Sequence, residues 1–129
     1  IKKVASGGEL SRLLLIMKSF ISKNDKNKTI IFDEVDSGLS GKVSGVVADK
    51  IVEISKYNQV LAITHSPQVA AKADKHWKIV KNIKNSNIME SSIIELNEED
   101  RIEEIANIFS GSSLSEASRK VAKELLLKK

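Results

Sequence analysis

Apolar residues recur along the chain with two different periods, and their alternation predicts the order of helices and strands. Apolar positions with helical spacing occupy 9–22 and 42–56, which predicts two amphipathic helices. Short β-branched or aromatic runs at 29–32 and 59–64 predict two strands. Because both strands are almost continuously apolar, we expect them to be buried. This alternation predicts an α/β domain with a mainly parallel sheet flanked by helices.

The second half of the chain follows a different pattern, with a short helix, two neighbouring strands and two further helices. The short helix is predicted at 66–74, the strands at 76–81 and 88–96, and the helices at 98–109 and 115–127. A polar segment joins the two strands. We expect residues 1–129 to form a single domain, since this length supports one core of modest size.

Composition narrows the class of protein without naming a function. The chain has 129 residues, of which 41% are hydrophobic and 29% charged. No apolar run approaches the roughly 20 residues of a membrane span, so we expect no membrane partner. The absence of cysteine excludes disulfides and thiolate metal sites and agrees with a cytoplasmic location. The net charge of +4 comes mainly from scattered lysines, which permit a polyanionic partner without marking a groove for one.

Polar residues that could take part in binding or catalysis follow both strands of the first half. The first predicted strand ends in Asp33 and Glu34, and the second ends in Thr64 and His65. In open α/β sheets, ligands bind beyond the carboxyl ends of the strands. Asp33 could there support Mg²⁺, Glu34 could act as a general base, and His65 could donate to a phosphate oxygen. Each feature alone also fits a structural role, in which the acids cap the strand and the histidine is merely hydrogen-bonded.

A glycine pair precedes the first predicted helix. Ser6, Gly7 and Gly8 offer backbone N–H groups at a helix N-terminus, where an anion is favoured and where no bulky side chain blocks its approach. The same residues also fit a flexible helix start. A phosphate-binding loop of the pattern G-x-x-x-x-G-K-[ST] is absent, because Asp36 and Val43 stand where that pattern needs Gly and Ser or Thr.

Three long motifs occur in a recognisable order: ASGGELSR (5–12), IIFDEVDSGLSGKV (30–43) and QVLAITHSPQVAAKAD (59–74). Together with the tail that begins at EEDRIEEIANIFSG (98–111), they resemble the C-terminal region of the RecN family of bacterial DNA-repair ATPases. This family is related to the SMC proteins and lies within the ABC-type ATPases. The resemblance covers nearly the whole chain.

The resemblance implies a role for each matching residue. The ABC signature motif, which contacts the γ-phosphate of an ATP held by the opposite subunit, is matched by Ser6, Gly7, Gly8 and Glu9. Asp33 matches the Walker B aspartate that supports Mg²⁺, and Glu34 matches the general base. The segment from Ser37 and Gly38 to Ser40 matches the D-loop at the dimer interface, and His65 matches the switch histidine that faces the γ-phosphate.

The implied fold is the C-terminal lobe of an ABC-type (P-loop NTPase-like) ATPase head, whose Walker A loop and Q-loop belong to an N-terminal lobe. The implied partners are that lobe, a second head in an ATP-sandwiched homodimer, and DNA through the full-length protein. The implied function is ATP hydrolysis in the repair of DNA double-strand breaks.

Two alternatives remain open at this point. The chain alone could be a non-catalytic folding and dimerisation module, or it could be part of the nucleotide-binding domain of another ABC-type ATPase. Ser40 departs from the aspartate that often ends the D-loop in the wider superfamily, which weakens the analogy with transporters.

Overall fold

The computed structural model describes residues 26–84, 88–111 and 114–128. In chain order its elements are β1 (Thr29–Asp33), α2 (Gly41–Ser55), β2 (Gln59–Ile63), α3 (Pro67–Lys72), β3 (Trp77–Lys84), β4 (Ile88–Glu95), α4 (Glu98–Ser110) and α5 (Glu116–Leu127). Every helix and strand predicted beyond residue 28 is thereby confirmed to within a few residues. The helix predicted at 9–22 and the glycine-containing motif before it lie outside the described residues.

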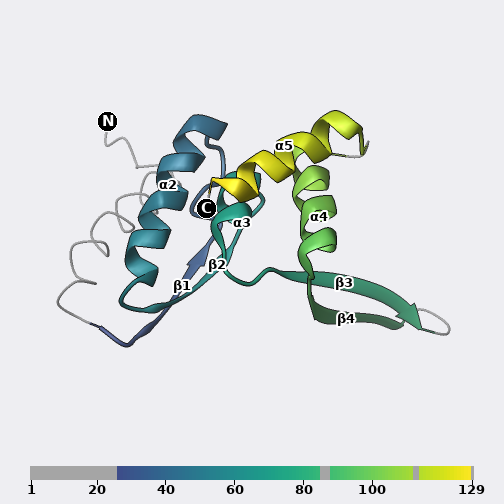
Figure 1. Ribbon diagram of the computed structural model, residues 1–129. Coiled ribbons are helices and arrows are strands. Elements are labelled where there is room, and N and C mark those ends of the chain that lie inside the picture. Colours follow the sequence, from purple (N-terminus) through teal and green to yellow (C-terminus); the bar gives the residue numbers. More distant parts are fainter. Residues whose placement is uncertain (1–25, 85–87, 112–113, 129) are drawn as a thin grey trace, which may run out of the picture.

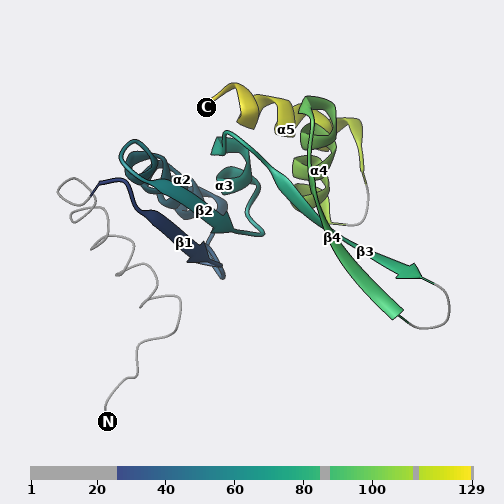
Figure 2. The same cartoon turned by 90° about the horizontal axis from the view of Figure 1, so that it is seen from below.

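Strands β1 and β2 form a parallel pair, as the alternation of strand and helix predicted. Their register runs from Thr29 opposite Gln59 to Asp33 opposite Ile63. Because the two strands are parallel and in step, both carboxyl ends reach the same edge of the sheet. Helix α2 connects the strands and lies along one face of the pair (Figures 1 and 2).

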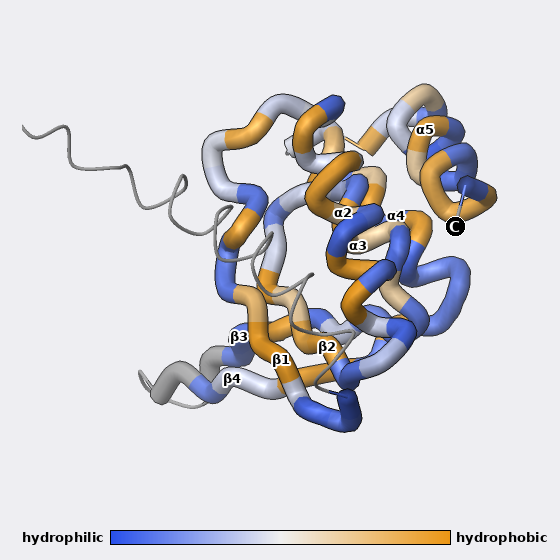
Figure 3. Tube along the Cα trace, turned by 90° about the vertical axis from the view of Figure 1, so that its left-hand side faces the viewer, coloured by the Kyte–Doolittle hydropathy of each residue, from blue (hydrophilic) through white to orange (hydrophobic). Residues whose placement is uncertain are grey.

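The core under α2 is formed by side chains from the sheet, the helix and the short helix α3. Its buried members are Phe32, Val35, Val47, Ala48, Ile51, Ile54 and Val69. Apolar residues occur along both strands and along α2 (Figure 3). Burial of these core side chains, of which Ile54 is fully enclosed, holds α2 on the sheet through the hydrophobic effect.

The prediction that both strands are buried is wrong for one face of the sheet. Ile31 and Ile63 point away from the α2 side and are 60% and 53% exposed. Phe32, which alternates with Ile31, is only 5% exposed. A run of apolar residues cannot distinguish a strand covered on both faces from a strand whose second face is left open.

Helix α3 lies between two cores and joins them. Pro67 occupies its first turn, where the missing N–H costs no hydrogen bond. Val69 packs into the core under α2, whereas Ala70 and Ala71 pack against α4 and α5 in a second cluster. The small alanine side chains allow these helices to approach closely, so this six-residue helix is fixed from both sides.

Strands β3 and β4 form a separate antiparallel hairpin that projects away from the β1–β2 pair (Figures 1 and 2). Its register runs from Trp77 opposite Glu95 to Lys84 opposite Ile88. An ion pair between Lys78 of β3 and Glu104 of α4 ties the hairpin base to the helices. The described sheets are thus one parallel and one antiparallel pair within a mixed α/β fold. In the part of the chain described, no helix is both long and apolar enough to cross a bilayer.

Candidate functional site

A tight turn follows β1 and turns the chain back toward α2. The Glu34 N–H donates to the Ile63 carbonyl at 2.9 Å and extends the pairing of the strands by one bond. The Ser37 N–H then donates to the Glu34 carbonyl at 3.0 Å, which closes the turn. Glu34 adopts a φ of 46°, in the left-handed region that costs a residue with a side chain roughly 1–3 kcal/mol. Gly38, with a φ of 71°, meets the same backbone requirement without that cost.

This turn brings together the two residues for which the sequence suggested acid–base and phosphate-binding roles. Glu34 Oε1 lies 3.1 Å from His65 Nε2, although the residues are 31 positions apart in the sequence. Their side chains are 51% and 86% exposed, respectively, so both present polar atoms to whatever approaches this edge. The contact follows directly from the register, because Glu34 and His65 lie just beyond the paired ends of β1 and β2.

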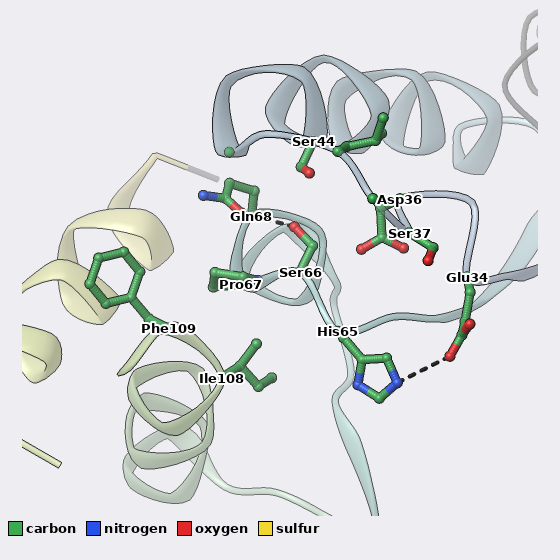
Figure 4. A pocket seen from close by; sticks show the side chains of 13 residues that line it. Glu34, Asp36, Ser37, Ser44, His65, Ser66, Pro67, Gln68, Ile108 and Phe109 are labelled. Carbon is green, nitrogen blue, oxygen red and sulfur yellow. Dashed lines mark hydrogen bonds and ion pairs between the residues drawn. The ribbon is translucent and has the colours of Figure 1, made fainter. Parts of the chain in front are cut away.

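Both residues belong to an open pocket of about 370 Å³ (Figure 4). The pocket is lined by Glu34, Asp36, Ser37, Gly38, Leu39, Gly41, Ser44, His65, Ser66, Pro67, Gln68, Ile108 and Phe109. Gly41 and Ser44 belong to the first turn of α2, whose N-terminus carries a partial positive charge from the helix dipole. Carboxylate, imidazole and hydroxyl groups therefore share a pocket with a helix end that favours anions.

Asp33 lies at the end of β1, opposite Ile63, with its side chain exposed and outside the pocket lining. The described residues contain no group of three or more His, Cys, Asp or Glu side chains that could hold a metal ion by themselves. Mg²⁺ commonly takes only one or two protein carboxylates and completes its shell with water and substrate phosphates. A single exposed carboxylate at this edge fits that mode of binding.

The site residues predicted from sequence thus fall into three groups. Glu34, Ser37, Gly38 and His65 line one pocket, Asp33 stands beside it, and the segment from Ser6 to Glu9 lies outside the described residues.

Several pocket residues were not predicted. Asp36 was considered only as a mismatch to a phosphate loop, and Ile108 and Phe109 of α4 were assigned only to a helix. The signal for Asp36 was available, because a third acid only two residues after Glu34 must either be solvated or find a partner. The position of α4 depends on tertiary packing, so no local pattern indicated that its end reaches the pocket.

No protein-family model matches the chain. The DNA repair protein RecN of Bacillus subtilis is 44% identical over 126 residues, which cover 98% of this chain and 22% of that protein. The DNA repair proteins RecN of Halalkalibacterium halodurans and Rickettsia conorii are also 44% identical, over 96% and 98% of this chain. The chain therefore spans about a fifth of the length of these curated relatives.

A solved structure gives an independent comparison at the level of the fold. It comes from work on ATP-driven dimerization and DNA-stimulated activation of SMC ATPases, and it superposes with a TM-score of 0.60 at 28% identity. The match covers 84% of this chain and 65% of that one. Sequence and fold agree, and the chain belongs among the homologues of RecN, corresponding to the C-terminal part of these proteins.

Proposed function

We propose that residues 1–129 form the C-terminal lobe of an ATPase head that hydrolyses ATP within a RecN-like DNA repair protein. The observation that carries this proposal is the contact between Glu34 and His65 at the carboxyl ends of two parallel strands. Similarity to RecN proteins and to an SMC ATPase supports it. The proposal assigns the pocket to the phosphate end of a nucleotide.

Each site residue has a distinct part in this mechanism. Glu34 accepts the proton of the attacking water, and His65 donates a hydrogen bond to a γ-phosphate oxygen. Bound Mg²⁺ would supply positive charge against the phosphates, with Asp33 as the residue that holds it. Ser37 and Gly38, both exposed on the turn, face a second head.

The segment that matches the ABC signature motif contributes the remaining contact. Ser6, Gly7, Gly8 and Glu9 bind the γ-phosphate of an ATP held by the second head, through backbone N–H groups at a helix start. The partners of this lobe are thus an N-terminal lobe of the same protein, a second copy of the head, and DNA bound by the full-length protein. Similarity to an SMC ATPase supports the first two of these partners.

The role of Glu34 is tested by Glu34→Gln in the full-length protein. The substitution keeps the size of the side chain but removes the basic carboxylate, so we expect steady-state ATP turnover to fall by about 100-fold or more while ATP binding is retained. A matched control is Glu53→Gln on α2, whose carboxylate pairs with Lys50 at 2.7 Å outside the pocket lining. The control should turn over ATP at the unaltered rate. Full turnover by the Glu34 variant would show that Glu34 is not the general base.

A further inference from the structure

A buried carboxylate lies behind the exposed pair of Glu34 and His65. Asp36, in the turn after β1, is only 7% exposed, although it is two residues from the half-exposed Glu34. A buried carboxylate is costly unless it is hydrogen-bonded. The Thr64 hydroxyl, which follows β2, donates a hydrogen bond to Asp36 Oδ2. This bond spans 28 positions in the sequence and links the loops that follow the two strands.

The Thr64 hydroxyl makes a second bond that extends the link. Its oxygen accepts a hydrogen bond from the Ser66 backbone N–H at 2.9 Å. Ser66 is itself 7% exposed, and its hydroxyl donates to Gln68 Oε1 at 2.8 Å. The Thr64 hydroxyl thus donates to Asp36 in the loop after β1 and accepts from Ser66 in the loop after β2.

The consequence concerns the residue between these two anchors. His65 lies between Thr64 and Ser66 in the sequence. Its side chain is 86% exposed, so few packing contacts hold the ring in place. Its backbone is fixed on one side by the Thr64 side chain and on the other by the Ser66 N–H. Asp36 accepts a hydrogen bond from the same hydroxyl. Asp36 lies on the turn that also carries Glu34 (Figure 4).

We infer that Thr64, held by Asp36, is a positioning residue that sets the distance between His65 and Glu34 during ATP hydrolysis. The inference rests on the proposed function, since it assigns a role to Thr64 in that same reaction. Thr64 is not among the residues that line the pocket, so the proposal gives it no contact with the nucleotide. Loss of the hydroxyl therefore lowers the rate of the chemical step without weakening ATP binding.

The test is Thr64→Val in the full-length protein, compared with Thr64→Ser. Valine has a similar shape but lacks the hydroxyl, so we expect kcat to fall about 10- to 100-fold while KM for ATP changes by less than about twofold. Serine retains the hydroxyl and should recover most of the lost rate. The matched control is Thr29→Val, because the Thr29 hydroxyl donates to Gln59 Oε1 at 2.8 Å across the same two strands, at their other end. This control should leave kcat unchanged.

A double-mutant cycle separates positioning from a general loss of structure. In a His65→Ala background, Thr64→Val should change kcat by less than about twofold, because the ring it positions is gone. An equal loss in both backgrounds, or a Thr64→Val protein as active as the unaltered one, would overturn the inference. The single variant His65→Ala tests the proposed function separately. If that variant is fully active, the assigned role of His65 fails, and the role of Thr64 fails with it.

Discussion

His76 lies at the junction between α3, the hairpin and α4, and its environment disfavours the charged imidazolium. Burial and the positive charge of Arg101 lower its pKa from the ordinary value, and Lys78 acts in the same direction while Glu104 opposes them. Its Nδ1 atom is buried and has no hydrogen-bond partner among the described residues. Protonation would place an N–H at that atom without an acceptor, which agrees with the direction of the pKa shift.

Acidification should therefore loosen this junction. A base whose pKa is lowered by folding binds fewer protons in the folded state, so the stability that it contributes is lost as the pH falls below the unfolded value of about 6.5. We expect amide protection in 76–81 and 98–104 to decrease between about pH 7 and pH 5. Hydrogen exchange with mass spectrometry, expressed as protection factors, measures this change. In His76→Gln the decrease should be absent, and an unchanged decrease would assign it to other groups.

At the scale of elements, one arginine joins two helices that are remote in sequence. Arg101 of α4 directs Nη2 at the carbonyl oxygens of Ala70, Ala71 and Ala73, at 3.3, 3.3 and 2.7 Å. These carbonyls belong to the end of α3, where a helix leaves its last carbonyls without intrahelical donors. The Ala73 N–H reaches the Ala70 carbonyl only at 3.4 Å. A helix of six residues is marginal without tertiary contacts, so the guanidinium is a main support of its C-terminal turn.

Replacement of this arginine should open the end of α3. Arg101→Met keeps much of the apolar stem but removes the donors, and we expect the local opening free energy at 70–73 to fall by about 1–3 kcal/mol. The matched control is Arg119→Met on α5, which removes an exposed ion pair with Glu103 on α4. That exposed pair should contribute little, because solvent screens it. Hydrogen exchange of residues 70–73 measures both, and equal effects of the two variants would contradict the role given to Arg101.

The elements themselves were well predicted because the signals for them are local. Pro67 marks the start of α3, the β-branched runs mark the strands, and the polar segment between 81 and 88 marks the hairpin. The burial of β1 and β2 was not predictable, because a second face is covered or open according to what packs on it. Ile31 and Phe32 are adjacent and similarly apolar, yet only one of them is buried.

The part of the site that lies directly at the strand ends could be predicted from the sequence. Glu34 and His65 meet because parallel strands in register deliver both of them to one edge. The bond between Asp36 and Thr64 was not predictable, since it depends on how the chain turns after Glu34, which adopts a positive φ. Such a backbone angle is uncommon for glutamate, and no residue pattern indicated it.

At the scale of the molecule, two apolar faces are left exposed among the residues that the structure describes. Besides the face of β1–β2 that carries Ile31 and Ile63, one face of the hairpin carries Trp77, Ile79 and Ile93, which are 51%, 64% and 69% exposed. Ile79 lies directly opposite Ile93, so both belong to the same face of the ribbon. Exposed apolar patches of this kind are typical of surfaces that bind another protein. Within the proposed function, the N-terminal lobe is the partner that covers them.

That assignment predicts the behaviour of the chain when it is mixed with the N-terminal part of the same protein. The chain alone should not hydrolyse ATP, and mixing should restore turnover that Glu34→Gln again abolishes.

Ile79→Lys should weaken association of the two parts by at least about tenfold, because it removes roughly 1.5–3 kcal/mol of apolar burial and adds a charge to the interface. Asn82→Lys is the matched control, since it adds the same charge on the same strand but on the opposite face of the ribbon, where Asn82 is exposed. Titration calorimetry measures both affinities. Equal affinity of the two variants would remove the hairpin from the interface, whereas ATP turnover by the chain alone would mean that this lobe binds and hydrolyses the nucleotide without its partner.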